Sequence, residues 1–229
     1  MIDDLHYKGR LKENVGRAFK RVDKIFATYG YCFYRFFNNL SVNCYSKVYF
    51  MPHSARYKIN YNENPKRKIL LTGALTESQY PNRMKMYNIS QKEEEVIYMK
   101  KIGGYRCAEG ANVEKLTTGA KYIKKLGDYL CCFTDDASVS RPYIVAKHFE
   151  ILSSGSLLLS CNPHTKKWFE KLGIKDGIHY ISCTSENMNS KVINILNPEN
   201  IDKINKIREE GYKLCLRHHM YENRGERIK

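Results

Sequence analysis

The stretch YIVAKHFEILSSGSLLLS, residues 143–160, contains the pattern that decides the fold of this 229-residue chain. Pro142 precedes it and can occupy the first turn of a helix, where its missing N–H removes no hydrogen bond. Apolar residues then recur at helical spacing, at Ile144, Val145, Phe149 and Leu152. Gly155 can end the helix because glycine adopts positive φ without strain. The apolar run 157–159 follows at once, which is typical of a strand covered on both faces of a parallel sheet.

The same alternation of strand and helix continues on both sides of this stretch. Strands are expected at residues 68–72, 96–99, 129–134 and 178–182. Helices are expected at residues 80–87, 116–126, 185–196 and 198–218, with a further one around Trp168. Strands and helices that alternate at this spacing form βαβ units. The sequence therefore predicts an α/β fold with a Rossmann-like, doubly wound parallel sheet.

The beginning of the chain has a different organisation. Residues 11–26 have the spacing of a helix and residues 47–51 (KVYFM) that of a strand, which is too little for a complete α/β domain. The polar segment RYKINYNENPKR, residues 56–67, indicates a linker. We therefore expect a partial lobe at residues 1–55, a linker at 56–67 and the α/β domain at 68–229.

Net charge and cysteine content limit the classes of partner and of site that this chain can have. The net charge of +15 favours anionic partners such as nucleotides, nucleic acid, acidic glycans or membrane surfaces. The eight cysteines include no CxxC pair, which argues against a zinc ribbon or a thioredoxin-type site, and no metal site is expected. The cysteines are expected to be reduced. Because no apolar leader and no run of 18 apolar residues occurs, we expect a cytoplasmic protein.

Candidate ligand-binding residues follow the expected strands, because sheets of this type bind ligands at the carboxyl ends of their strands. Gly73 opens a small-residue turn whose N–H groups could reach a phosphate, and Arg83 could add further donors. The alternative is an ordinary turn with a surface arginine. Asp135 and Asp136 could bind a cation, although capping of the next segment or solvation is the favoured interpretation.

The segment KHFEILSSGSLLL, residues 147–159, resembles the donor-nucleotide segment of GT-B glycosyltransferases. The resemblance, to the carboxyl-terminal domain of the group-1 (family-4-like) enzymes, extends to residues 68–83. It implies that Glu150 accepts hydrogen bonds from the ribose hydroxyls of a nucleotide-sugar. It also implies that Gly155 and Ser156 lie beside the diphosphate. Lys147, three residues before Glu150, is the nearest cation that could meet that diphosphate.

The sequence also departs from that family. Many relatives carry a glutamate eight positions before the one that corresponds to Glu150, where this chain has Pro142. Gly104 and Tyr105 follow Ile102 and Gly103 rather than the His–Pro pair of relatives. Contacts made by that first glutamate and by that histidine are therefore not carried over to this chain.

Residues 1–55 resemble the tail of a GT-B amino-terminal domain, with most of that lobe missing. The resemblance implies a strand near residues 25–27 and a last helix that crosses back to the first lobe. It makes Asp4 and His6 candidate catalytic residues, although Asp3 and Asp4 could equally cap a helix. Aromatic residues crowd one short segment, at Tyr29, Tyr31, Phe33, Tyr34, Phe36 and Phe37. This crowding predicts self-association or a partner chain that completes the lobe. The alternative is that these residues pack against the long last helix.

The resemblance implies a metal-independent glycosyltransferase without a cofactor, for which a nucleotide-sugar is the substrate. The sugar would pass to a glycan, protein or lipid acceptor that the sequence does not identify. Helix ends with Arg83 or Lys147 would stabilise the leaving diphosphate. One alternative is an inactive remnant that acts as a binding or scaffolding module. Another is a basic nucleic-acid-binding protein, against which the sequence lacks a helix-turn-helix, a zinc finger and an RNP-like strand.

Overall fold

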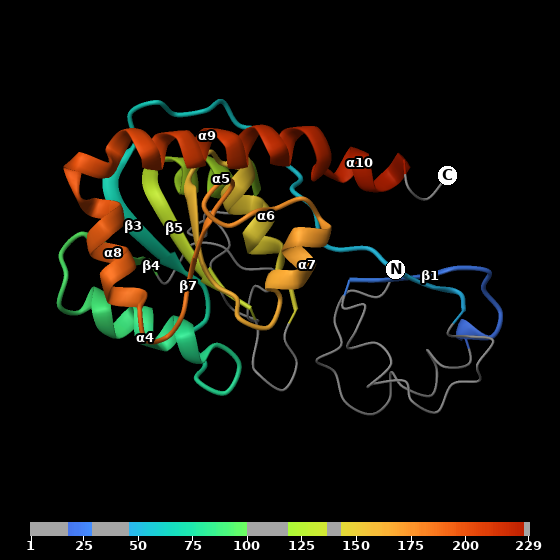
Figure 1. Cartoon of the computed structure of the whole chain (residues 1–229). Coiled ribbons are helices and arrows are strands. Elements are labelled where there is room, and N and C mark those ends of the chain that lie inside the picture. Colours follow the sequence, from blue (N-terminus) through green and yellow to red (C-terminus); the bar gives the residue numbers. More distant parts are fainter. Residues whose placement is uncertain (1–17, 29–45, 100–118, 137–142, 227–229) are drawn as a thin grey trace, which may run out of the picture.

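The computed structural model describes residues 18–28, 46–99, 119–136 and 143–226. Their centre is a five-stranded sheet in the order β4-β3-β5-β6-β7, in which every neighbouring pair is parallel (Figure 1). The strands are β3 Lys66–Thr72, β4 Val96–Met99, β5 Tyr129–Asp135, β6 Leu157–Cys161 and β7 Ile181–Cys183. The predicted α/β class with a doubly wound parallel sheet is therefore confirmed.

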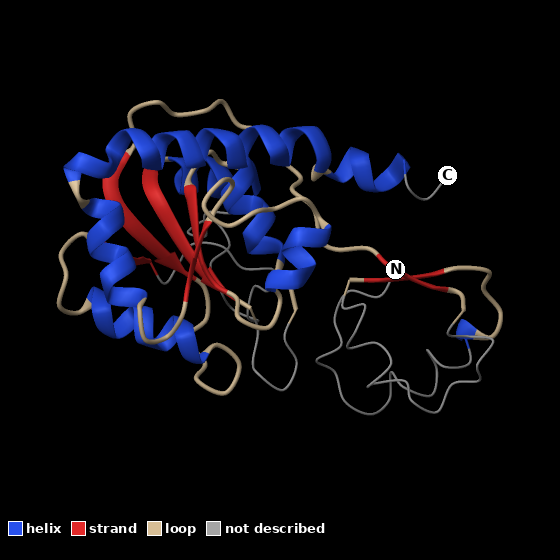
Figure 2. Cartoon of the chain, viewed as in Figure 1, coloured by secondary structure: helices blue, strands red, loops and turns tan. Residues whose placement is uncertain are grey.

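Helices cover both faces of this sheet (Figure 2). One face packs against α5 Gly119–Gly127, α6 Ala146–Ser153 and α7 Lys166–Lys171. The other face packs against α4 Pro81–Ser90 and α8 Met188–Leu196. After the short 3-10 helix η2 Pro198–Asn200, α9 Ile201–His218 contributes to both faces and is followed by α10 Tyr221–Glu226. None of the helices in the described ranges combines the length and the apolar character needed to span a membrane.

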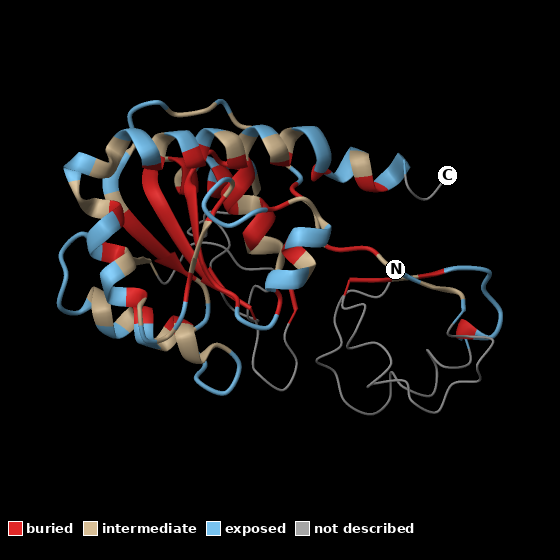
Figure 3. Ribbon diagram, viewed as in Figure 1, coloured by how far each residue is buried: buried red, intermediate tan, exposed pale blue. Residues whose placement is uncertain are grey.

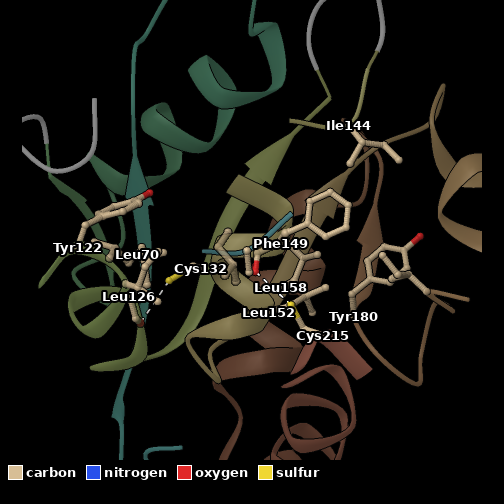
Figure 4. Packing of buried hydrophobic residues seen from close by; sticks show 14 of the residues in the cluster. Leu70, Tyr122, Leu126, Cys132, Ile144, Phe149, Leu152, Leu158, Tyr180 and Cys215 are labelled. Carbon is tan, nitrogen blue, oxygen red and sulfur yellow. Dashed lines mark hydrogen bonds between the residues drawn. The ribbon is translucent and has the colours of Figure 1, made fainter. Parts of the chain in front are cut away.

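Strand β6 lies in the core, as its apolar sequence predicts (Figure 3). Leu158 packs with Phe149 and Leu152 of α6 on one face (Figure 4), whereas Leu157 and Leu159 join the cluster on the other face. All five side chains are 0% exposed. Burial of each such side chain contributes about 1.5–3 kcal/mol, so β6 with α6 is a major source of stability.

Helix α6 begins later than the sequence predicts. We expected it to start at Pro142, but Val145 is its N-cap, with an extended backbone at φ −77° and ψ 155°. Ile144 precedes the helix and is buried nonetheless. β-branched side chains such as Ile144 and Val145 favour extended backbone, so their apolar spacing reflects burial rather than helical structure. The helix ends at Ser153, and Gly155 has the expected positive φ of 75°.

The first block contributes a separate two-stranded parallel pair, β1 Ile25–Ala27 and β2 Val48–Phe50. The helix predicted over residues 11–26 is wrong at its end, because pairing with β2 places Ile25 and Phe26 in a strand. The resemblance to a GT-B amino-terminal domain anticipated this strand. Residues 1–17 and the aromatic segment at 29–37 lie outside the described residues, so the predicted partner surface stays a prediction.

Residues 56–65 run along the α/β domain and are held to it by aromatic contacts and hydrogen bonds. Tyr61 lies 5.4 Å from Tyr212 of α9 between ring centroids, and the Tyr212 hydroxyl donates to the Ile59 carbonyl at 2.6 Å. Ala55 forms a parallel bridge with Met220, immediately before α10. Strand β3 begins at Lys66, inside the predicted linker. The division of the chain into two lobes stays a prediction.

Candidate functional site

The order of the strands creates one place where a ligand can bind. The chain passes from β3 to β4 on one side and then to β5 on the other side, so the connections diverge between β3 and β5. Sheets of this kind bind ligands at the carboxyl ends of the strands that flank such a divergence. A cavity of about 440 Å³ lies there, lined by the turn after β3, the first turns of α4, α5 and α6, and residues 54, 56 and 57.

Gly73 forms the floor of this cavity immediately after β3. Its φ is +100°, a conformation that residues with a Cβ rarely adopt. A Cβ at this position would lie 2.6 Å from Nζ of Lys147 and 3.1 Å from Nη1 of Arg83. The turn therefore requires glycine both for its conformation and for the approach of two cations.

Arg83 is held by Asp135, the last residue of β5. The Arg83 backbone N–H donates to Oδ2 of Asp135 at 3.0 Å, and its Nη2 donates to Oδ1 at 2.9 Å. Nη1 donates to the Ala74 carbonyl at 3.1 Å, and the guanidinium stacks over the Tyr80 ring at 3.8 Å from the centroid. Burial raises the pKa of Asp135, against the opposing effect of Arg83. Arg83 thus closes a buried ion pair in the cavity wall, and sequence reasoning missed its partner.

Lys147 brings a second cation to the cavity from the first turn of α6. Its Nζ donates to the Thr72 carbonyl at 2.9 Å and to the Thr72 hydroxyl at 2.8 Å. Burial, followed by the nearby charge of Arg83, lowers the pKa of Lys147 to about 7, while Glu150 and Asp135 oppose this shift. Burial therefore makes the charged ammonium group costly, and an anion in the cavity would stabilise it.

The start of α6 also offers backbone donors. Val145, Ala146, Lys147 and Glu150 all line the cavity, and the N-cap Val145 supplies no side-chain hydrogen bond to the first turn. Amides at a helix start carry a partial positive charge and bind anions. Glu150 lies one turn further along the same helix, beside the same cavity. This wall thus combines donors for an anion with a carboxylate that can accept hydrogen bonds.

His148 holds the start of α6 in place from the buried side of the helix. The sequence did not point to this residue. The ring is fully buried, with Nδ1 3.1 Å from the Val145 carbonyl and Nε2 3.1 Å from the Ser160 hydroxyl. Because a carbonyl can only accept, Nδ1 carries the proton and Nε2 accepts from the serine. Burial lowers the pKa of His148 to about 3, so the ring is neutral. It ties the start of α6 to β6.

Tyr122 of α5 is a second residue that the sequence did not reveal. Its hydroxyl lies 3.4 Å from the Thr72 hydroxyl, and its side chain lines the cavity. Burial, with a further contribution from Glu150, raises the pKa of Tyr122. Thr72 therefore meets both Tyr122 and Lys147. The position of Thr72 at the end of a predicted strand was the sequence signal that could have pointed to Thr72.

Solved glycosyltransferases share this arrangement of elements. Staphylococcus aureus TarM superposes with a TM-score of 0.61 at 12% identity, over 99% of this chain and 47% of TarM. HepE of Anabaena, in complex with UDP and glucose, gives 0.65 at 11% identity, over 97% of this chain and 66% of HepE. The pneumococcal O-GlcNAc transferase GtfA, in complex with UDP and GlcNAc, superposes with a TM-score of 0.58 at 12% identity, over 95% of this chain and 46% of GtfA.

The fold is GT-B. The chain spans about half the length of TarM and of GtfA and 66% of HepE. No protein-family model and no curated protein matches the sequence. At these identities the likeness concerns the fold, which confirms the GT-B resemblance at that level.

Within this GT-B fold, the predicted donor residues fall into two groups. Gly73, Arg83, Lys147 and Glu150 line one cavity, as expected. Gly155 does not: it follows the far end of the eight-residue helix α6, about 12 Å along the helix from its start.

Contacts at Gly155 and Ser156 explain their separation from the cavity. The Gly155 carbonyl accepts from Nε of Arg208 at 3.1 Å, and a Cβ there would lie 2.7 Å from the Tyr61 ring. The Ser156 hydroxyl donates to the Tyr129 carbonyl at 2.9 Å, at the amino end of β5. Gly155 and Ser156 therefore do not line the cavity beside Glu150, and their contact with a diphosphate stays a prediction. The candidate catalytic residues Asp4 and His6 lie outside the described residues.

Asp136 accepts a hydrogen bond from the segment just before α7. It is 3% exposed, and its Oδ2 accepts from the His164 N–H at 3.2 Å, so it bonds a distant segment rather than the next one along the chain. Burial raises the pKa of Asp136 to about 7. Within the ranges that the structure describes, no group of three or more His, Cys, Asp or Glu is arranged to hold a metal ion.

Proposed function

We propose that this chain binds a nucleotide-sugar between the carboxyl ends of β3 and β5 and acts as the donor-binding part of a glycosyltransferase. The observation that carries the proposal is the first two turns of α6. The backbone amides of the first turn and Lys147 stand at the start of this wall, and Glu150 stands one turn later. An anionic group followed by vicinal hydroxyls, as in a nucleoside diphosphate, complements this order of donors and acceptor.

The roles of the residues follow from their chemistry. The diphosphate binds the α6 amides and Lys147, whose ammonium is stabilised by the negative charge. Glu150 accepts from the ribose hydroxyls, and Gly73 admits the ligand close to the backbone. Arg83 keeps α4 and the turn after β3 in place through Asp135. Because Lys147 supplies the positive charge, binding does not depend on a metal ion. The UDP complexes of GtfA and HepE support the choice of ligand class.

Calorimetric titration with uridine, UDP, GDP, ADP and the corresponding nucleotide-sugars, in buffer with EDTA, tests this proposal. We expect saturable binding of at least one nucleoside diphosphate. Lys147→Met should weaken UDP binding and leave uridine binding unchanged, because it removes a phosphate contact. Glu150→Gln should weaken both by about 10- to 150-fold, which corresponds to hydrogen bonds to a charged group.

Matched controls are the exposed Lys203→Met and Glu199→Gln, near the far ends of the strands. They should bind like the wild type. If no nucleotide or nucleotide-sugar binds up to millimolar concentration, the proposal is wrong. If Lys147→Met lowers the affinity for uridine as much as the affinity for UDP, Lys147 does not contact the phosphates.

A second measurement separates a transferase from a binding remnant. A transferase releases UDP from a UDP-sugar, at least slowly by transfer to water, and Lys147→Met should slow this release. Binding without release of UDP, in the presence of candidate glycan, protein and lipid acceptors, would favour the binding module.

A further inference from the structure

A third wall of the cavity comes from the segment between β2 and β3. Ser54, Arg56 and Tyr57 line the cavity, whereas Ala55 between them is 0% exposed and belongs to the core. The Arg56 guanidinium lies 5.5 Å from the Tyr57 ring centroid. Within the described part of the chain, Arg56 forms no ion pair. A solvated cation therefore stands at the edge of the proposed ligand site.

The carboxyl-terminal segment holds this wall in place. The Ala55 N–H donates to the His219 carbonyl at 2.9 Å, and the Tyr221 N–H donates to the Ala55 carbonyl at 2.8 Å. Both backbone groups of Ala55 are thereby bonded to the carboxyl-terminal segment. The direction in which Ser54 and Arg56 project is thus fixed by backbone pairing.

Arg224 of α10 reinforces the same attachment. This side chain is 5% exposed. It donates from Nε to the Pro52 carbonyl and from Nη2 to the His53 carbonyl, both at 3.4 Å, and from Nη1 to the His218 carbonyl at 3.0 Å. Its guanidinium also lies 5.7 Å from the ring centroid of Phe149 in α6. One buried side chain thus joins α10, the chain before Ser54 and the helix that carries Lys147 and Glu150.

The charges of the other cavity residues favour a further cation such as Arg56. Arg83 is paired with Asp135, Lys147 is close to its titration point at neutral pH, and Glu150 is a nearby acid. A nucleotide-sugar carries a negative charge on each of two phosphates. The first turn of α6 therefore does not balance that charge without a further cation.

We propose that Arg56 binds a phosphoryl oxygen of the nucleotide-sugar and that Arg224 is the positioning residue that holds Arg56 at the site. This inference rests on the proposed donor site. It extends the site to the segment between the lobes and to the carboxyl-terminal helix. Affinity for the diphosphate then depends on α10, which does not line the cavity.

The first test is Arg56→Gln, titrated with uridine and with UDP. We expect UDP affinity to fall about three- to tenfold, as suits one partly solvated charged contact, and uridine affinity to stay the same. Arg67→Gln, which removes an exposed arginine at the amino end of β3, away from the cavity, should change neither. If the wild type binds UDP and Arg56→Gln binds it equally well, Arg56 is only a surface residue that stacks on Tyr57. If the wild type does not bind UDP or any other nucleotide, the donor site itself is wrong.

The second test is a double-mutant cycle between Arg224→Met and Arg56→Gln. If Arg224 acts by positioning Arg56, Arg224→Met weakens UDP binding in the wild type but has no further effect in the Arg56→Gln background. A merely structural role for Arg224 predicts the same loss in both backgrounds and would overturn the positioning role. Arg224→Lys, which keeps the charge, provides the cycle if Arg224→Met does not fold.

Discussion

Arg83 and Asp135 are joined by hydrogen bonds of 3.0 and 2.9 Å that run from the first turn of α4 to the carboxyl end of β5. Both side chains are almost completely buried. Because α4 follows β3 in the chain, this ion pair joins the two strands that flank the cavity. It holds the start of α4 against the end of β5 at the point where the ligand is proposed to bind.

Asp135→Ala should strongly destabilise the protein. It leaves the Arg83 guanidinium buried without its carboxylate, and loss of one partner of a buried pair costs about 3–5 kcal/mol. The free energy of unfolding, measured by urea titration, gives the size of the effect. Asp128→Ala, which removes the half-exposed partner of Lys125, is the control and should cost less than about 1 kcal/mol. Similar losses in the two variants would contradict the structural role of the Arg83–Asp135 pair.

The same substitution at two glycines should have different effects on binding. Gly73 and Gly155 both have positive φ, at 100° and 75°, so alanine should destabilise the fold at either position by about 1–2 kcal/mol. A Cβ at Gly73 also meets Lys147 and Arg83, whereas a Cβ at Gly155 meets Tyr61. Gly73→Ala should therefore weaken UDP-sugar binding, and Gly155→Ala should leave it unchanged. A loss of affinity in Gly155→Ala would restore the original assignment of that turn to the diphosphate.

Binding of a nucleotide-sugar should weaken as the pH rises. Lys147 has a pKa of about 7 in the folded protein, below its ordinary value of 10.5 because of burial. A bound diphosphate favours the charged form, so the complex takes up a proton above pH 7. Affinity should fall by up to about tenfold per pH unit between pH 7 and 9. Titration with a UDP-sugar, whose phosphates do not ionise in this range, measures this dependence. In Lys147→Met the profile should be flat, and a slope that persists there would assign the proton to another group.

Asp136→Asn should stabilise the protein more at pH 8 than at pH 5. Burial raises the pKa of Asp136 to about 7, so the folded protein holds a proton that the unfolded chain releases near its ordinary value of 3.8. The stability that this carboxyl contributes is complete below pH 4 and is lost as the pH rises to 7. Asparagine stays neutral and can still accept from the His164 N–H. Melting temperatures at both pH values measure the difference, with the exposed Asp202→Asn as control. An equal shift at both values would contradict the raised pKa.

The central sheet and the place of the candidate site at its edge could be predicted from the sequence for a physical reason. Parallel strands end at a common edge, so residues just after predicted strands and at the start of the following helices meet there. This reasoning placed Gly73 and Arg83 at that edge, whereas Glu150 and Lys147 were expected there from the resemblance to GT-B enzymes. The resemblance also put Gly155 and Ser156 beside the diphosphate, but they follow the opposite end of α6 from Lys147, because residues close in sequence can lie at opposite ends of a helix.

Other features depend on contacts between distant parts of the chain. Asp135 was seen as a possible cap, but its pairing with Arg83 depends on how α4 packs against β5. Arg56 lies in a polar segment whose composition indicates a linker, and nothing local shows that Met220 pairs with Ala55 and turns Arg56 to the cavity. The true start of α6 was hidden because buried extended residues and helical residues share the same apolar pattern.

The parallel bridge between Ala55 and Met220 has a mechanical consequence. The polypeptide enters the α/β domain and leaves it at the same point, where the two segments are hydrogen-bonded to each other. The part of the chain before Pro52 is therefore joined to the domain through two hydrogen-bonded segments rather than through one.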